Sequence, residues 1–259
     1  MAKYLTLEHL GQSAIITINN PPANLWTIDS LHELTATMTT LQADKAVRSV
    51  VITGAGEAFF CAGADLKLFA TGSKQEVQTL LDAFSAAFAA VRDYSGVTVA
   101  AINGYALGGG LECALMCDYM VVERGAKLGL PEAKVGLLPA CGGSKRLTEK
   151  VGASWAKRII LGGEILDAQK AYAIGLVEEI VDPGFAKIIA VSLAGKVANQ
   201  APLAVARARQ LIEQSATLSL QEHVQLEQQA LLSLIGGEEQ LEGVAAFLGK
   251  RAPSWADED

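Results

Sequence analysis

The sequence predicts an α/β fold that ends in a helical C-terminal region. Short apolar runs with strand character alternate with segments of helical periodicity as far as Gly142, and helical segments dominate after it. Alternation of this kind is typical of α/β domains. Apolar residues make up 51% of the 259 residues and charged residues 19%, a balance that suits a large globular core.

Six segments are predicted to be strands, several of them ended by turn-forming residues. The N-terminal segment alternates apolar and polar residues, the strand at 14–18 stops at the turn cluster 19–22, and the buried strand at 49–53 stops at 54–56. The remaining predicted strands are 97–102, 119–122 and the brief 177–181.

Helical spacing predicts helices between these strands and through the second half of the chain. The segment 28–43 has Asp29 and Ser30 as start signals, 76–91 is amphipathic, and a helix from about Gly109 to Met116 follows a run of glycines. The other predicted helices are 145–151, 154–161, 167–174, 185–199, 202–214, 219–235 and 238–248.

Two parts are predicted from this order of elements. Residues 1–199 form the α/β core with the candidate site, and residues 200–259 form a helical region that packs on the core or on a neighbouring subunit. No low-complexity segment, linker or short-period repeat stands out between them.

Composition excludes several classes of function. The net charge of −7 argues against a general nucleic-acid-binding protein. The N-terminus has no apolar segment of a secretory signal, so we expect a cytoplasmic protein. The stretch 97–117 has the length of a membrane span but contains Asn103, Glu112 and several glycines, and we expect a buried strand, loop and helix there instead.

The cysteines and histidines do not predict a metal site. Cys61, Cys113, Cys117 and Cys141 form no CxxC motif, and the three histidines are scattered. We expect the four cysteines to be reduced, small, buried residues of a cytosolic protein.

A run of three glycines, 108–110, lies between a predicted strand and a predicted helix. Glycine allows a sharp turn and a close approach of a ligand to the backbone, and a helix start leaves N–H groups unpaired. The site could therefore stabilise a negative oxygen, although three glycines alone are more often a tightly packed turn. The GxGxxG spacing of a dinucleotide site is absent.

A second segment, 62–66, follows the preceding strand. Asp65 can cap a short helix that begins near Leu66, which would direct the N–H of Ala64 into the same cleft. We favour the cap over a catalytic role for Asp65.

Two glutamates lie in apolar surroundings near these segments. Glu112 is nearly one helical turn beyond Gly109, and Glu132 follows Pro131. A buried carboxylate needs a partner or a proton. Taken alone, Glu112 is best explained by a structural ion pair and Glu132 by a favourable position in a first helical turn.

Together, and in this order and spacing, the motifs resemble the enoyl-CoA hydratase/isomerase (crotonase) superfamily over essentially the whole chain. The matching segments are 60–67, 103–112, 130–132 with Gly136, 142–147, 175–177 and 242–253. The resemblance implies a crotonase (ClpP-like) spiral of ββα units with a C-terminal helical trimerisation region, in a homotrimer or a hexamer.

The resemblance also implies a site. Backbone N–H groups of Ala64 and Gly109 would hold the carbonyl oxygen of an acyl-CoA thioester, and Glu112 and Glu132 would bind one water. The family's CoA-binding positions correspond here to Ala62, Asp65, Leu66, Lys67 and a basic residue near the C-terminus, Lys250 or Arg251.

Glutamate at both positions favours hydration of a trans-2-enoyl-CoA, as in fatty acid β-oxidation, with no cofactor beyond the CoA of the substrate. The alternatives are a Δ3,Δ2-enoyl-CoA isomerase, a hydratase of a specialised acyl-CoA, and a silent acyl-CoA-binding protein. A serine hydrolase is disfavoured because no GxSxG motif appears. Ala140 and Trp26 depart from the usual pattern of the family, and we expect them to affect substrate choice.

Overall fold

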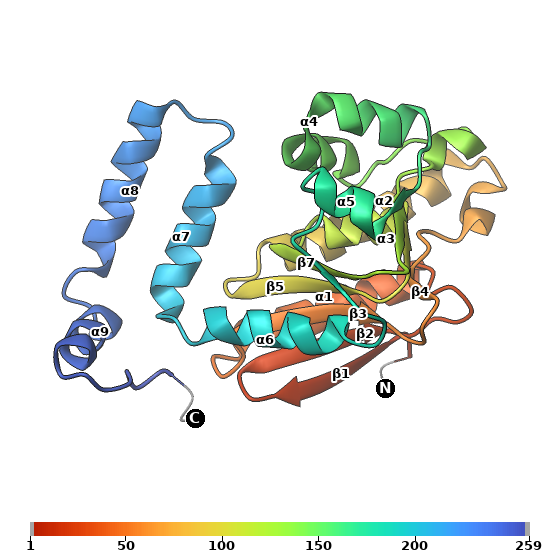
Figure 1. Cartoon of the computed structure of the whole chain (residues 1–259). Helices are drawn as coiled ribbons and strands as arrows, with labels where there is room; N and C mark the ends of the chain where they lie inside the picture. The colour runs from red at the N-terminus through yellow and green to blue at the C-terminus, as the bar shows by residue number, and fades with distance from the viewer. Residues whose placement is uncertain (1–2, 257–259) are drawn as a thin grey trace. The chain divides into compact units, whose positions relative to one another are not determined.

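The computed structural model describes residues 3–256 and shows an α/β protein with two sheets. The larger sheet has the strand order β1-β2-β3-β5-β7-β10 and is parallel except for the pair β1 and β2 (Figure 1). The smaller sheet has the order β4-β6-β8-β9 and is parallel except for the pair β8 and β9. The predicted α/β class is confirmed.

The bounds of the elements are as follows. The larger sheet consists of β1 (Leu5–Leu10), β2 (Ser13–Ile18), β3 (Ser49–Gly54), β5 (Val97–Ile102), β7 (Tyr119–Glu123) and β10 (Glu179–Val181). The smaller sheet consists of β4 (Phe59–Cys61), β6 (Tyr105–Leu107), β8 (Lys127–Gly129) and β9 (Leu166–Asp167). The α-helices are α1 (Ile28–Ala43), α2 (Lys74–Arg92), α3 (Gly109–Ala114), α4 (Gly143–Leu161), α5 (Ala168–Ala173), α6 (Ala186–Ala198), α7 (Pro202–Gln214), α8 (Leu220–Leu234) and α9 (Glu238–Leu248). Two short 3-10 helices are η1 (Leu66–Phe69) and η2 (Glu132–Val135).

Consecutive strands divide between the two sheets and produce a spiral of ββα turns. The strands β3, β5 and β7 lie in the larger sheet, and the strand after each of them, β4, β6 and β8, lies in the smaller one. The next α-helices along the chain are α2, α3 and α4. The spiral that the resemblance implies is therefore confirmed. The four strands of the smaller sheet were not predicted, because two or three residues are too few to show a period.

The middle of the larger sheet is buried on both faces, and its strands are mostly apolar. All six residues of β3 and all six of β5 are buried, as expected for parallel strands inside an α/β fold. Asn103, directly after β5, donates to the carbonyl oxygens of Gly54 (3.0 Å) and Gly56 (2.7 Å) and accepts from the N–H of Gly54 (3.1 Å). These bonds join the carboxyl ends of β3 and β5, at the points where the chain passes from each strand into the smaller sheet.

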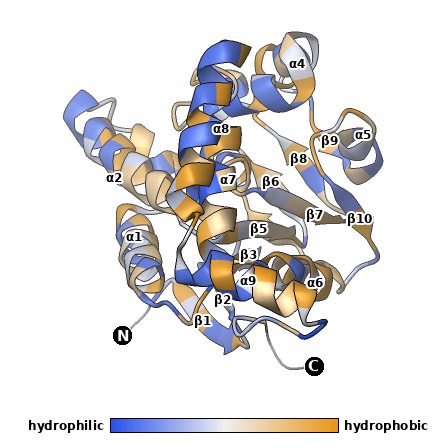
Figure 2. Cartoon of the chain, turned by 90° about the vertical axis from the view of Figure 1, so that its left-hand side faces the viewer, coloured by the Kyte–Doolittle hydropathy of each residue, from blue (hydrophilic) through white to orange (hydrophobic). Residues whose placement is uncertain are grey.

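The helix α1 has the predicted bounds, and a capping box forms at its start. Its N-cap is Thr27, whose hydroxyl accepts from the N–H of Ser30, while the Ser30 hydroxyl accepts from the N–H of Thr27. Both predicted start signals are confirmed, because Asp29 is the acidic residue of the first turn and Ser30 is the third helical residue of a capping box, while the N-cap Thr27 was not predicted. Both α1 and α2 carry hydrophilic and hydrophobic faces (Figure 2), and their apolar faces pack against each other.

The two helices predicted at 145–151 and 154–161 follow each other within α4, where a kink at Gly152 separates them. Gly152 has φ 76° and ψ 162°, a backbone conformation outside the helical region that glycine adopts without strain. The predicted break was therefore correct.

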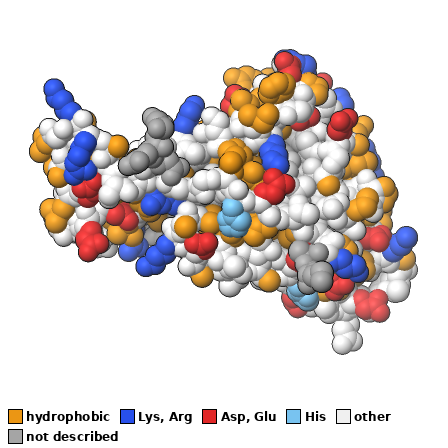
Figure 3. Space-filling model, turned by 90° about the horizontal axis from the view of Figure 1, so that it is seen from below, with side chains coloured by type: hydrophobic (Ala, Val, Ile, Leu, Met, Phe, Trp, Pro, Cys, Tyr) orange, Lys and Arg blue, Asp and Glu red, His pale blue; other side chains and the backbone are white. Residues whose placement is uncertain are grey.

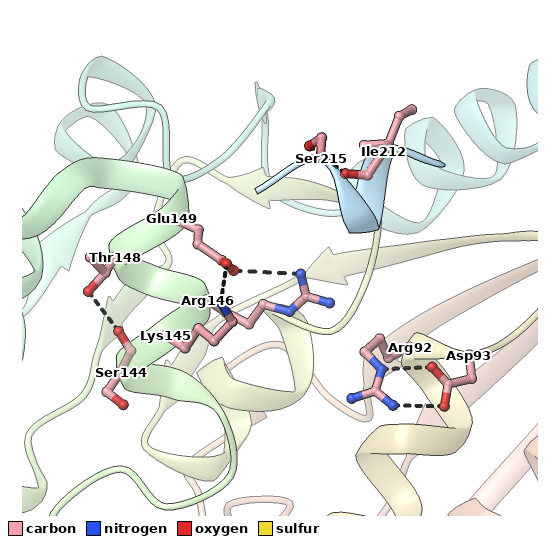
Figure 4. Close-up of polar contacts among 9 residues, drawn as sticks. All are labelled: Arg92, Asp93, Ser144, Lys145, Arg146, Thr148, Glu149, Ile212 and Ser215. Carbon is pink, nitrogen blue, oxygen red and sulfur yellow. Dashed lines mark hydrogen bonds and ion pairs between the residues drawn. The ribbon is translucent and has the colours of Figure 1, made fainter. Parts of the chain in front are cut away.

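The chain divides into two compact units, one ending at Ala194 and the other beginning at Gly195, a few residues before the predicted division at 199 and 200. Within the second unit, Ser219 and Glu222 form a capping box at the start of α8. The hydroxyl of Ser215 donates to the carbonyl oxygen of Ile212 (2.7 Å) after α7 (Figure 4). Arg251 pairs with Glu242 through two bonds of 2.6 and 2.7 Å.

No single helix of the described chain has the length and hydropathy of a membrane span, and α6 and α7 meet that standard only as a bent pair. On the face shown in Figure 3, basic and acidic side chains are interspersed among apolar and neutral ones.

Candidate active site

A cavity of about 880 Å³ is lined by residues of the predicted motifs. Its lining comes from the loop after β4, from η1, from one face of α2, from the start of α3, and from the stretch that runs from Pro131 through η2 to Cys141. Ala64, Gly109, Glu112 and Glu132 all line it. Segments far apart in the sequence thus meet around one space that is large enough for a small-molecule ligand.

The N–H of Ala64 is directed by a short parallel bridge with Trp26. The N–H of Trp26 donates to the carbonyl oxygen of Gly63 (2.8 Å), and the carbonyl oxygen of Trp26 accepts from the N–H of Asp65 (3.3 Å). Because neighbouring residues of an extended chain point to opposite sides, Ala64 between them directs its own N–H away from Trp26. Ala64 itself lines the cavity.

The second donor lies beside the first because the backbones of two loops are in contact. Gly109 is the first residue of α3, and its N–H has no partner within the helix. A Cβ on Gly63 would lie 3.4 Å from that nitrogen and 3.0 Å from the carbonyl oxygen of Leu107. A Cβ on Gly110 would overlap the carbonyl oxygen of Cys61. Only glycine permits this packing of α3 against the end of β4.

Glu112 is buried, with 3% of its surface exposed, and one of its carboxylate oxygens is fixed by backbone donors. Its Oε1 accepts from the N–H of Cys141 and from the N–H of Gly143, both at 2.9 Å. Burial raises the pKa of Glu112, and these two hydrogen bonds oppose the increase. Both bonds use Oε1, which leaves Oε2 to bind a ligand.

The second carboxyl group of the cavity belongs to Glu132, the first residue of η2, and its pKa is also raised. Burial and the nearby charge of Glu112 raise its pKa to about 7. Its Oε2 is buried and has no hydrogen-bond partner among the described residues. Its Oε1 would lie 3.3 Å from a Cβ on Gly108, so the carboxyl group is next to the start of α3. The structural ion pair considered for Glu112 is absent among the described contacts, where backbone N–H groups take the place of a cation.

The first turn of α4 holds the donors to Glu112 in place. A Cβ on Gly143 would lie 2.7 Å from Oε1 of Glu112, so the backbone can approach the carboxylate only without a side chain. Figure 4 shows the bonds that support this turn: the Thr148 hydroxyl donates to the Ser144 carbonyl oxygen (2.7 Å), and Lys145 (2.7 Å) and Arg146 (3.7 Å) pair with Glu149.

Comparison with known proteins shows the family of the chain. The sequence model of the enoyl-CoA hydratase/isomerase family matches residues 11–258. The chain belongs to this family. It is 37% identical to a probable mitochondrial enoyl-CoA hydratase of Dictyostelium discoideum, with 96% of this chain and 90% of the relative covered. It is also 37% identical to the 2,3-dehydroadipyl-CoA hydratase of Escherichia coli K12, with 93% and 94% covered.

Solved structures of the enoyl-CoA hydratase/isomerase family and similar chains have the same fold. DspI of Pseudomonas aeruginosa matches with a TM-score of 0.95 and 47% identity over 98% of this chain and 97% of that one. An enoyl-CoA hydratase of Bacillus anthracis matches with a TM-score of 0.94 and 34% identity over 99% and 100%. The crotonase fold is therefore shown for the chain as a whole, and an acyl-CoA thioester is the substrate class that fits the family.

Several other residues predicted for this enoyl-CoA hydratase/isomerase site have identifiable places. Ala62, Leu66 and Ala140 line the cavity. Asp65 is the N-cap of η1, where its Oδ1 accepts from the N–H of Lys67 (3.0 Å), so the predicted cap is present. Lys67 itself is exposed and does not line the cavity.

Trp26 does not face the cleft as expected. Its side chain is fully buried in the core, and its ring packs edge-on against Phe88 with centroids 6.4 Å apart. A Cβ on Gly109 would lie 3.6 Å from its Cδ1, so the indole supports the start of α3 from behind. Trp26 is therefore in contact with both Ala64 and Gly109 from outside the cavity. Lys250 lies in the C-terminal unit with φ 52°, and its role in CoA binding stays a prediction.

Two features of the cavity were not anticipated. Cys141, expected to be buried, is partly exposed and lines the cavity, and burial with the charges of both glutamates raises the pKa of its thiol. One face of α2 also lines the cavity, through Val77, Leu81 and Phe84. The periodicity of α2 predicted a buried face, but an apolar face packed on a core and one that lines a cavity have the same sequence pattern.

A first prediction concerns stability. The pKa of Glu132 is raised above its ordinary value of 4.5 to about 7, so the folded state disfavours the charged form and wild-type stability falls as the pH rises from 4.5 to 7. Glu132→Gln should raise the free energy of unfolding at pH 8 by about 1–2 kcal/mol, a value reduced because the carboxyl is partly exposed. Denaturant unfolding at pH 4 and pH 8 measures this increase.

The increase in the free energy of unfolding should vanish at pH 4. The control Glu57→Gln, at an exposed position, should show no increase at either pH. An equal effect of Glu132→Gln at both values contradicts a raised pKa.

A second prediction concerns the support of Glu112. Gly143→Ala places a methyl group against Oε1 and displaces the carboxylate, so enoyl-CoA turnover should fall between about 10- and 100-fold. Steady-state kinetics with parallel thermal unfolding measures this. Gly125→Ala is the matched control, because nothing lies within 4 Å of a Cβ at Gly125. Unchanged turnover in a folded Gly143→Ala variant would show that the contact does not fix Glu112.

Proposed function

We propose that this protein adds water across the 2,3 double bond of a trans-2-enoyl-CoA to give a 3-hydroxyacyl-CoA. The observation that carries the proposal is the presence of Glu112 and Glu132 on the wall of one cavity together with Ala64 and Gly109. Relatives named enoyl-CoA hydratase, at 33–38% identity over nearly the whole chain, support the reaction class.

The two backbone donors act on the thioester. Binding of the carbonyl oxygen between the N–H groups of Ala64 and Gly109 polarises the conjugated system and makes C3 electrophilic. Negative charge that develops on the oxygen during attack meets both donors and the positive end of α3. One donor of this type contributes about 3–4 kcal/mol to stabilisation of such a transition state.

The two carboxyl groups divide the proton transfers according to their surroundings. Glu112 is the base, because two N–H groups stabilise its anion. It takes a proton from the water whose oxygen forms the bond to C3. Glu132 is the acid, because its unpartnered, buried Oε2 favours the protonated form, and it delivers that proton to C2. The pair begins and ends with one proton between its two members, and transfer of that proton from Glu112 to Glu132 resets the site.

The proposal includes no cofactor besides the CoA of the substrate. It also includes a homotrimer or hexamer, a cytoplasmic location and a role in fatty acid β-oxidation. The isomerase alternative needs only the second carboxylate, and a silent binding protein needs neither. The presence of Glu112 in the cavity, held by two donors, favours the hydratase over both.

The third prediction tests the assignment directly. Glu112→Gln and Glu132→Gln should each lower kcat for crotonyl-CoA at least about 100-fold, because each removes an acid or base. The measurement is loss of the conjugated enoyl absorbance with appearance of 3-hydroxybutyryl-CoA. Loss of activity only in Glu132→Gln, with a Δ3-enoyl-CoA converted by the wild type, would favour the isomerase. Wild-type turnover in either variant contradicts the two-glutamate mechanism.

A further inference from the structure

One face of α2 runs from the catalytic centre to the surface. Phe84, Leu81, Val77 and Lys74 follow one another at spacings of three or four residues, and all four line the cavity. Phe84 is buried, and a Cβ on Gly109 would lie 3.2 Å from its ring, which places it beside the second backbone donor. Leu81 and Val77 are half-buried, and Lys74 is exposed. This row, here called the α2 stripe, thus extends from the thioester position to solvent.

The wall beyond the carboxylates is apolar as well. C3 of the substrate must reach Glu112 and Glu132, so the acyl tail meets whatever lies past them. Leu137, whose N–H donates to the carbonyl oxygen of Glu132 (3.0 Å), and Leu138 follow Glu132 closely in the chain and also line the cavity. Leu66, Val135 and Leu138 line it while 55%, 54% and 70% exposed. A ligand that covers these side chains would remove apolar surface from water.

We propose that the α2 stripe is the channel for the acyl chain, and that it makes the enzyme prefer apolar acyl groups of about eight carbons or more to short ones. This inference rests on the proposed function. The amide groups of the CoA arm would lose hydrogen bonds against Phe84, Leu81 and Val77, whereas a hydrocarbon chain loses none.

The length follows from helix geometry. From Phe84 to Val77 is seven residues and from Phe84 to Lys74 is ten, which at about 1.5 Å per residue corresponds to about 10 and 15 Å. An extended alkyl chain advances about 1.3 Å per carbon, since each bond of about 1.5 Å is inclined to the chain axis. The apolar part of the stripe therefore spans about eight carbons, and the end at Lys74 about twelve.

The dependence of kcat/KM on acyl chain length should rise and then level off. Each methylene that leaves water adds at most about fourfold to binding, so kcat/KM should rise with each carbon pair from C4 to about C10. Beyond about C12 the chain passes Lys74 and emerges into solvent, so kcat/KM should level off.

The fourth prediction uses trans-2-enoyl-CoAs from C4 to C16 with the full-length protein. The wild-type ratio of kcat/KM for C10 over C4 should be at least about 30. Leu81→Trp fills the channel one turn from Phe84 and should lower this ratio at least about tenfold. Val77→Phe lies farther out, so it should lower the C10 value relative to C4 while leaving the ratio of C6 to C4 nearly unchanged. Thr79→Trp is the matched control, because Thr79 is exposed on the same helix, does not line the cavity, and should leave the ratio unchanged.

The outcomes separate the inference from the proposed function. Turnover with a flat or falling profile, or an equal loss for C4 and C10 in Leu81→Trp, overturns the channel while hydration stands; the equal loss would indicate that the stripe holds the CoA arm. If no substrate is hydrated, calorimetric binding of butyryl-CoA and decanoyl-CoA decides the matter. Tighter binding of decanoyl-CoA that is lost in Leu81→Trp supports the channel, and equal affinities overturn it. Val77→Phe gives the answer if Leu81→Trp does not fold.

Discussion

The close contact between the start of α3 and the end of β4 is the constraint on which the site depends. No side chain fits between Gly110 and the carbonyl oxygen of Cys61, and Gly63 lies against the backbone of Leu107 and Gly109. This contact brings together two N–H groups from different turns of the spiral. It also fixes Glu112, which lies nearly one helical turn beyond the Gly109 donor. The N–H groups of Ala64 and Gly109 and the carboxyl group of Glu112 therefore belong to one closely packed backbone unit.

The second carboxylate gains its properties from that unit. Glu112 must remain in a buried position, and the N–H groups of Cys141 and Gly143 make this possible by stabilising its anion. Burial, together with the nearby charge of Glu112, raises the pKa of the neighbouring Glu132 to about 7. An acid and a base can thus coexist a short distance apart because their environments differ.

The sequence was sufficient where a signal is local or carried by several motifs at once. Residue type and spacing predicted the bounds of α1 and β5 and the Asp65 cap, and the family resemblance of several motifs predicted that both glutamates meet Ala64 and Gly109 around one cavity. The sequence was insufficient where tertiary packing decides. The three-residue strands β4, β6 and β8 have no visible period, Trp26 lies behind the donors instead of in the cleft, and the α2 stripe has the pattern of any core-facing helix.

The central claim is that one proton is shared by Glu112 and Glu132 during turnover of a thioester held by Ala64 and Gly109. The pH dependence of kcat/KM for crotonyl-CoA tests it most directly, because it reports the ionisation of the free enzyme. We expect kcat/KM to decrease above a pKa of about 7, as Glu132 loses its proton, and to decrease again in acid, as Glu112 gains one. Activity that stays unchanged from pH 6 to about pH 9, across the pKa of Glu132, would contradict it.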